Sequence, residues 1–169
     1  PILFVQTRVG RKGRLFGMLK LRTMVPNAHK LETYLRKESA ENGGYGNGTY
    51  SDPRVTRIGS LLRLLNLDEL PQLINVLKGE MSLVGPRMIS FPELEKFGPW
   101  RDKILEVKPG ITGLWQVKGR GELDYDERIR LNVYYVDNRS LMLDLTILAK
   151  TIPCRDNCPR RILVPSNSN

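Results

Sequence analysis

The sequence predicts an α+β fold that is mostly helical, with a short β-hairpin followed by amphipathic helices packed as one compact domain. Two observations carry this prediction. Residues 2–24 alternate apolar runs with a glycine-rich turn, as a hairpin does. Further along, leucine and isoleucine recur at intervals of three and four residues, as on one face of a helix. At 169 residues the chain is long enough for one domain with a core, and its 40% hydrophobic content argues against disorder.

The hairpin has its strands at residues 2–5 and 15–21, joined by a basic turn at 10–13. A helix is predicted over residues 27–41, with leucines four residues apart. Residues 42–48 hold four glycines and predict a loop, which lacks the Lys-Ser/Thr of a P-loop.

Asp52-Pro53 predicts a turn before two consecutive helices. The first covers residues 56–65. The second runs from Asp68 to Lys78, with Pro71 in its first turn and Gly79 ending it. Its predicted core face consists of Leu70, Leu73, Ile74 and Leu77.

The remaining elements are shorter or more interrupted. They are an extended segment over 80–88, an amphipathic stretch over 91–106 broken at Gly98-Pro99, a turn and short strand over 108–117, and helices over 124–137 and 140–150. Trp115 is expected in the core. Asp144 is expected to bond locally to the backbone.

The net charge of +9, from 27 Lys and Arg against 18 Asp and Glu, implies an anionic partner. Nucleic acid, an acidic membrane surface and a phosphorylated substrate all fit this charge. The helix from Asp68 has few side chains that read bases, and its acidic start repels phosphate, so nucleic acid is not expected. Cys154 and Cys158 lack the further ligands of a zinc site, so free thiols are favoured over a disulfide.

Asp68 and Glu69 form the most informative pair of the chain. Arginines precede them, and Gly85-Pro86-Arg87 follows. Carboxylates within a cationic surround suit phosphoryl transfer, in which one carboxylate attacks phosphorus or holds a metal. The same two residues are also typical of a helix N-terminus, as a cap and a first-turn acid. The spacing alone leaves both interpretations open.

A series of motifs in fixed order resembles the bacterial sugar transferase family, the monotopic polyprenyl-phosphate phosphoglycosyl transferases. The motifs are Arg8-Val9-Gly10-Arg11, Lys20-Leu21-Arg22-Thr23-Met24, Leu67-Asp68-Glu69-Leu70-Pro71-Gln72, Met81-Ser82-Leu83-Val84-Gly85-Pro86-Arg87, Lys108-Pro109-Gly110-Ile111-Thr112-Gly113-Leu114-Trp115-Gln116-Val117 and Leu143-Asp144-Leu145. The resemblance covers residues 1 to about 152, which we take as the catalytic domain, with a divergent tail over 153–169.

The resemblance implies transfer of a sugar-1-phosphate from a UDP-sugar to polyprenyl (undecaprenyl) phosphate, with release of UMP. It implies Mg²⁺ dependence and a membrane-associated domain at the cytoplasmic face of the bacterial inner membrane. Such enzymes initiate the assembly of capsules, exopolysaccharides, lipopolysaccharides or protein glycans.

The family motifs also imply roles for individual residues. Asp68 would be the nucleophile that carries a covalent phosphosugar, and Glu69 would serve the metal, with Asp68 as its neighbour in the metal site. The residues expected to contact phosphate and nucleotide are Lys20, Arg63, Arg87 and Arg120.

The chain departs from the family pattern at several points. Asn132 stands where an aspartate is typical, Lys118 where asparagine is common, and Met88 where proline often follows the arginine. The family's membrane helix is expected upstream of Pro1, in a longer parent protein. Asn132 and the altered tail favour an alternative, a catalytically impaired homologue that binds a membrane or a partner.

Overall fold

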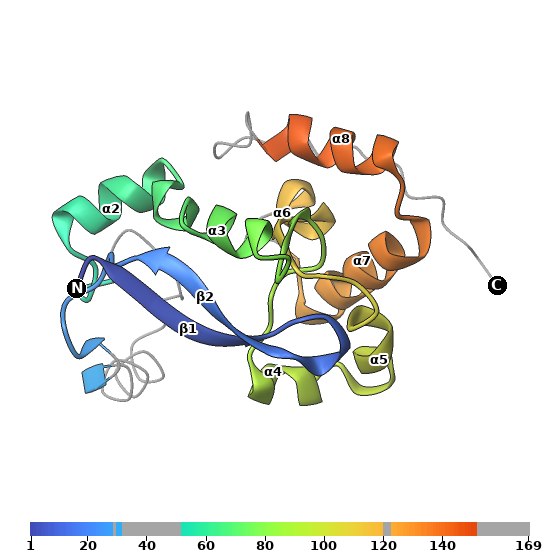
Figure 1. The fold of residues 1–169 in the computed structure, drawn as a ribbon, viewed down its shortest axis with the longest axis horizontal. Coiled ribbons are helices and arrows are strands. Elements are labelled where there is room, and N and C mark those ends of the chain that lie inside the picture. The colour runs from blue at the N-terminus through green and yellow to red at the C-terminus, as the bar shows by residue number, and fades with distance from the viewer. Residues whose placement is uncertain (29, 32–51, 120–122, 152–169) are drawn as a thin grey trace. The chain divides into compact units, whose positions relative to one another are not determined.

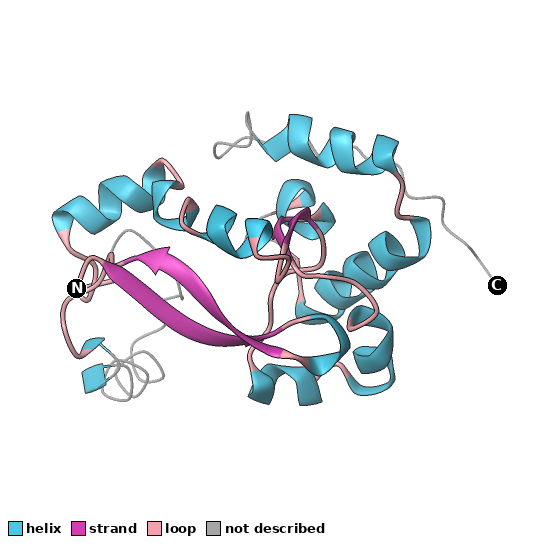
Figure 2. Ribbon diagram, in the orientation of Figure 1, coloured by secondary structure: helices cyan, strands magenta, loops and turns pink. Residues whose placement is uncertain are grey.

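The computed structural model describes residues 1–28, 30–31, 52–119 and 123–151. About half of these are helical, and the strands form two small two-stranded sheets (Figures 1 and 2). The mixed character of the fold, helices with small sheets, is therefore confirmed. The chain divides into two compact units: the first unit is residues 1–5 and 19–71, and the second unit is residues 6–18 and 72–169. The single domain over 1–152 stays a prediction, and the tail lies outside the described residues.

The predicted hairpin is present. Strand β1 (Leu3–Val9) pairs with β2 (Leu15–Leu21), and a 3₁₀ turn, η1 (Arg11–Gly13), connects them. Lys12 and Gly13 both have positive φ, 56° and 76°, which lets the chain reverse within three residues. The first strand extends four residues beyond its predicted end. The helix expected over 27–41 and the glycine-rich loop over 42–48 fall largely or wholly outside the described residues.

The first unit contains helix α2 (Arg57–Leu64), as predicted. Its N-cap is Thr56, whose side-chain oxygen accepts a hydrogen bond from the Gly59 amide at 2.9 Å. The predicted turn before it is closed by a bond from the Val55 amide to the Asp52 carbonyl at 3.0 Å. The Asp52 carboxylate also receives three short bonds from the Arg54 guanidinium, at 2.6–3.1 Å. These local polar bonds fix how the chain enters α2.

The helix predicted from Asp68 to Lys78 is wrong at its N-terminal end. Asp68 lies in a 3₁₀ turn, η2 (Leu67–Glu69), and helix α3 begins only at Gln72 (Gln72–Leu77). The reason is Pro71, which has no amide hydrogen to donate to the carbonyl four residues earlier. The Leu70 amide bonds the Leu67 carbonyl instead, so the turn stays 3₁₀ up to the proline.

The core face predicted for the same segment is also wrong. Its four members are exposed by 43–87%: Leu70, Leu73, Ile74 and Leu77. Helical periodicity identifies an apolar face but not what covers it. Within the described part of the chain, every buried hydrophobic side chain belongs to the second unit.

The second unit contains most of the helices. After α3 come β3 (Ser82–Val84), α4 (Phe91–Glu95), η3 (Gly98–Trp100), α5 (Arg101–Ile104), β4 (Gly110–Thr112), α6 (Leu114–Lys118), α7 (Tyr125–Asn138) and α8 (Leu141–Thr151). Strands β3 and β4 are parallel, with Ser82 opposite Gly110 and Val84 opposite Thr112. The break at 98–99 and the last two helices match the prediction. Helix α6 was missed, because only the strand before it was predicted in residues 108–117.

Three apolar clusters form the core of the second unit. One joins the end of β1 to α4, α5 and α7, the next joins β3 to α6, α7 and α8, and the last joins β2 to the segments flanking β3. Gly85 sits so close to the neighbouring strand that a Cβ would lie 2.6 Å from the Lys108 carbonyl oxygen. This close approach fixes the segment that leads into Arg87, which bridges to Gly110.

No helix among the described residues is long and apolar enough to cross a bilayer.

Candidate active site

A backbone contact in the first unit positions α2. Gly59 packs directly on the Thr23 main chain: a Cβ there would lie 2.7 Å from the Thr23 carbonyl carbon. The Thr56 amide bonds the Thr23 carbonyl at 3.0 Å, and the Arg63 Nε donates to the Thr23 Oγ1 at 3.0 Å. The two ends of α2 are thereby tied to the same residue just after β2.

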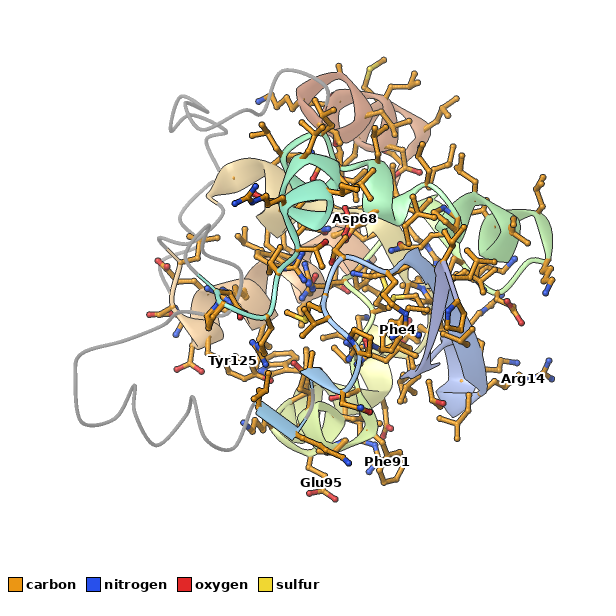
Figure 3. The ribbon with its side chains drawn as sticks, turned by 90° about the vertical axis from the view of Figure 1, so that its left-hand side faces the viewer. Phe4, Arg14, Asp68, Phe91, Glu95 and Tyr125 are labelled. Atoms are coloured by element: carbon orange, nitrogen blue, oxygen red, sulfur yellow. The ribbon has the colours of Figure 1, made fainter. Side chains whose placement is uncertain are left out.

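The chain then turns sharply into the acidic pair. Asn66 has φ 55°, a left-handed conformation that asparagine tolerates, and η2 follows it at once. Figure 3 shows Asp68 beside α2. Lys20, on β2, forms an ion pair with the Glu69 carboxylate at 3.2 Å, and both side chains are partly buried. The turn thus places two adjacent carboxylates close to the basic side chains of Lys20 and Arg63.

Asp68 is the buried member of the pair, with 9% of its surface exposed. Burial raises the pKa of its carboxyl group, and the neighbouring charge of Glu69 raises it further. The positive charges of Lys20 and Arg63 oppose both effects. A carboxylate withdrawn from water, with two cations close enough to influence it, is well placed to react with a phosphorylated substrate.

Four of the six predicted site residues therefore lie together in the first unit: Lys20, Arg63, Asp68 and Glu69. Arg87 lies in the second unit, and Arg120 lies outside the described residues. Sequence reasoning missed Thr23 and Gly59 as supports of this group. A glycine inside a helical pattern is the signal that was available for Gly59, since it often marks close backbone approach.

Two further positions from the sequence lie in the second unit. Asn132, on α7, is buried, with 5% of its surface exposed. Asp144, on α8, does not bond only locally: its Oδ1 accepts a hydrogen bond from the Tyr135 hydroxyl at 2.8 Å. The same hydroxyl lies 3.3 Å from the Val84 carbonyl oxygen, so this contact joins α7, α8 and β3.

The acidic pair suits one kind of metal site. Among the described residues, no three His, Cys, Asp or Glu side chains gather as a protein cage for a metal would require. Mg²⁺ is commonly bound by one or two carboxylates together with substrate phosphates and water. Asp68 and Glu69 would supply the two carboxylates for such an ion, which would relieve the repulsion from Glu69 that adds to the raised pKa of Asp68.

Comparison with known proteins decides the family. The family model described as bacterial sugar transferase matches residues 1–155. This chain belongs to the bacterial sugar transferase family. The resemblance based on the ordered motifs is thereby confirmed, and the family is one of transferases.

Several relatives are more than 40% identical. An uncharacterized sugar transferase of Haemophilus influenzae is 45% identical over 153 residues, covering 89% of this chain and 32% of that protein. The undecaprenyl-phosphate galactose phosphotransferase of Salmonella typhimurium is 45% identical over 158 residues, covering 89% and 32%. The exopolysaccharide production protein ExoY of Sinorhizobium fredii is 43% identical over 155 residues, covering 90% and 69%. The chain thus spans about a third of the length of two of these relatives.

Proposed function

We propose that this chain transfers a sugar-1-phosphate from a UDP-sugar to a polyprenyl phosphate and releases UMP. The proposed polyprenyl acceptor is undecaprenyl phosphate. The observation that carries the proposal is the buried Asp68 carboxylate with Glu69, Lys20 and Arg63 around it. Relatives named as undecaprenyl-phosphate galactose and glucose phosphotransferases support the substrate classes. Relatives named as exopolysaccharide production proteins support a role in starting surface polysaccharide assembly.

The reaction proceeds in two displacements at one phosphorus atom. An Asp68 carboxylate oxygen attacks the phosphorus that carries the sugar, and the bond between that phosphorus and the bridging oxygen breaks, so that UMP leaves. An oxygen of polyprenyl phosphate then attacks the phosphosugar-aspartate. This second step breaks the acyl phosphate bond, restores Asp68 and yields a polyprenyl diphosphate sugar.

The surrounding side chains make an anionic nucleophile and an anionic substrate compatible. Lys20 and Arg63 favour the ionised form of Asp68, against the effect of burial. They also offset charge on the phosphates. Glu69 and Asp68 would hold Mg²⁺, which when bound neutralises charge on the diphosphate.

A membrane surface is the proposed setting, at the cytoplasmic face of the inner membrane. Five apolar side chains within and around α2 and η2 are at least 36% exposed: Ile58, Leu61, Leu65, Leu67 and Leu70. They lie on the segment that carries Asp68, where a lipid acceptor must arrive. Apolar side chains beside basic residues are typical of surfaces that bind acidic lipid.

Asn132 favours a second candidate, a catalytically impaired homologue that binds a membrane or a partner enzyme. Where the family pattern has an aspartate, the buried Asn132 amide brings no negative charge. A gain in turnover of tenfold or more on Asn132→Asp, from a barely active starting protein, would favour this candidate.

UMP release tests the leading proposal. The full-length protein is assayed with Mg²⁺, undecaprenyl phosphate in detergent, and a panel of UDP-hexoses and UDP-N-acetylhexosamines. We expect release with at least one donor, and loss of more than about a thousandfold in Asp68→Asn, as for other catalytic nucleophiles. Asp102→Asn, an exposed carboxylate on α5, is the matched control. Equal turnover by the Asp68→Asn and Asp102→Asn proteins would refute the assignment.

A further inference from the structure

Two arginines contact the same tryptophan ring in the second unit. Trp115, near the start of α6, is 92% buried. The guanidinium carbon of Arg87 lies 5.6 Å from the centre of its ring system, and that of Arg128, on α7, lies 5.2 Å away. Both contacts are cation–π interactions, which favour guanidinium groups. Arg128 is held further by a bond from its Nε to the Leu123 carbonyl at 3.1 Å.

A third arginine belongs to the same group. Arg8, near the end of β1, forms a long ion pair with Glu93 at 3.4 Å and bonds Gln6 at 2.9 Å. Burial lowers the pKa of Arg8; Glu93 opposes this, and the nearby charge of Arg87 adds to it. Burial raises the pKa of Glu93, because it disfavours the charged carboxylate. Hydrogen bonds from Ser90 and the charges of Arg8 and Arg87 outweigh this and bring the Glu93 pKa below its usual range. Arg8, Arg87 and Glu93 are therefore electrostatic neighbours.

The residues of this group supply too little negative charge and too few hydrogen-bond acceptors for its arginines and its tryptophan. The guanidinium groups of Arg8 and Arg87 share the carboxylate of Glu93, and Arg128 adds a third positive charge beside Trp115. Two N–H donors of the group, the Arg8 Nε and the Trp115 indole Nε1, are buried without a hydrogen-bond partner among the described residues. A buried donor without an acceptor is costly, so a native structure that keeps two of them in one group of side chains needs an explanation.

A phosphate group supplies what is missing. It brings negative charge and only acceptor oxygens, and arginine binds it in a planar, two-pronged geometry. We propose that Arg87 and Arg128, which contact the Trp115 ring, bind a phosphate group of a substrate together with Arg8, the electrostatic neighbour of Arg87. The proposal adds Arg8, Arg128 and Trp115 to the phosphate contacts expected from the sequence, of which Arg87 is the one that lies in this group.

The identity of the phosphate rests on the proposed function, which offers two sources. One is the diphosphate of the nucleotide donor, and the other is the monophosphate of the lipid acceptor. Both present the same oxygens to the arginines, so binding experiments must separate them.

Calorimetric titration of the full-length protein at fixed, low salt separates the two sources. One arm uses UDP and inorganic pyrophosphate, and the other uses farnesyl phosphate in detergent, with farnesol as its uncharged control. Arg8→Gln and Arg128→Gln should each weaken binding in at least one arm by tenfold to a hundredfold, the usual effect of a lost bond to a charged group. Arg130→Gln, an exposed arginine on the same helix as Arg128, should change it less than twofold.

Weakening confined to UDP and pyrophosphate assigns the site to the donor, and weakening confined to farnesyl phosphate assigns it to the acceptor. Either result supports the proposal. If both variants match Arg130→Gln in both arms, the proposal is wrong. In a protein whose tryptophans other than Trp115, Trp100 among them, are replaced by phenylalanine, the fluorescence of Trp115 gives a second readout that leaves the three arginines intact. It should change as either phosphate compound binds, and no change with either would also overturn the proposal.

Binding and turnover can fail independently. Phosphate binding that depends on Arg8 and Arg128, in a protein that releases no UMP from any donor, would refute the proposed function and leave this site in place. If the protein releases UMP but Arg8→Gln and Arg128→Gln leave phosphate binding unchanged, this site would be refuted and the proposed function would stand.

Discussion

Replacing Gly59 by alanine tests whether the contact between α2 and Thr23 positions the acidic pair. A Cβ at this position would lie 2.7 Å from the Thr23 carbonyl carbon and 2.8 Å from its Cα, where ordinary contact begins at 3.4 Å. The added Cβ would stand on the backbone of α2 and meet main-chain atoms of Thr23, which no side-chain movement can clear. Helix α2 and the Thr23 segment must therefore separate to relieve the clash. Such overpacking costs about 1–3 kcal/mol, and rigid backbone favours the upper end.

Helix propensity acts in the opposite direction. Alanine in place of glycine inside a helix stabilises it by about 1 kcal/mol. The difference leaves Gly59→Ala about 2 kcal/mol less stable than the unchanged protein. Moving α2 also withdraws Arg63 from Thr23, so we expect turnover to fall about tenfold to a hundredfold even where the variant stays folded.

Urea unfolding followed by circular dichroism measures the stability change, and UMP release measures the turnover. Ser60→Ala, at the next position of α2, is the control, because it raises helix propensity without meeting the Thr23 backbone. A Gly59→Ala protein as stable as the unchanged protein, or more so, would show that the Thr23 contact does not constrain α2.

The remaining predictions concern one ion pair, one hydroxyl and one lysine. Hydrogen bonds from Arg54 hold the pKa of Asp52 below its usual range. The stability that this ion pair adds should therefore be present at neutral pH and be lost as pH falls below about 4. By urea unfolding, Asp52→Asn should cost about 1.5–3 kcal/mol at pH 7 and less at pH 3. Burial, and to a smaller extent the bond to Asp144, raises the pKa of Tyr135. The stability that the Tyr135 hydroxyl adds should therefore persist up to about pH 10 and fall above it. Tyr135→Phe should cost about 1–2 kcal/mol of unfolding free energy at pH 8 and reduce the loss of stability at alkaline pH. Lys20→Gln should lower kcat/KM for the UDP-sugar about tenfold or more, since it removes a positive charge beside Asp68, the proposed nucleophile.

Each of these has a clear contrary result. An Asp52→Asn protein whose stability loss is as large at pH 3 as at pH 7 would contradict the ionic origin of its effect. Unfolding with the same alkaline dependence in the Tyr135→Phe and unchanged proteins would contradict the second prediction. For Lys20, the control is Arg14→Gln, an exposed charge at the turn of the hairpin (Figure 3), and equal kcat/KM in both variants would contradict the third.

Local patterns predicted most of the elements, because they depend on neighbours in the chain. The glycine turn at 10–13, the apolar spacing over 56–65 and the break at Gly98-Pro99 each correspond to an observed feature. Pro71 is the instructive failure. A proline is accepted in the first turn of a helix, so the spacing of the leucines favoured one continuous helix. The Leu67–Leu70 bond kept the turn 3₁₀ instead, which moved Asp68 off the helix N-terminus.

The site was predicted in part because of the motifs around it. Asp68 and Glu69 stand out as adjacent acids, and Lys20 and Arg63 match basic positions of the family pattern. What the sequence cannot give is tertiary placement. Arg8 lies on β1 just before the basic hairpin turn, where arginines usually face water, yet its side chain is only 18% exposed and pairs with Glu93, 85 residues away. Trp115 was correctly expected to be buried, but nothing in its spacing indicated the two arginines over its ring.

Intact mass spectrometry of the full-length protein measures whether Asp68 becomes covalently modified by the donor. The protein is incubated with Mg²⁺ and its UDP-sugar donor, without the lipid acceptor, and compared with the Asp68→Asn variant. We predict a mass increase of one phosphosugar on Asp68, absent in the variant and removed when undecaprenyl phosphate is added. A protein that releases UMP with the acceptor, yet forms no such adduct, or forms it equally in Asp68→Asn, would contradict the role proposed for Asp68.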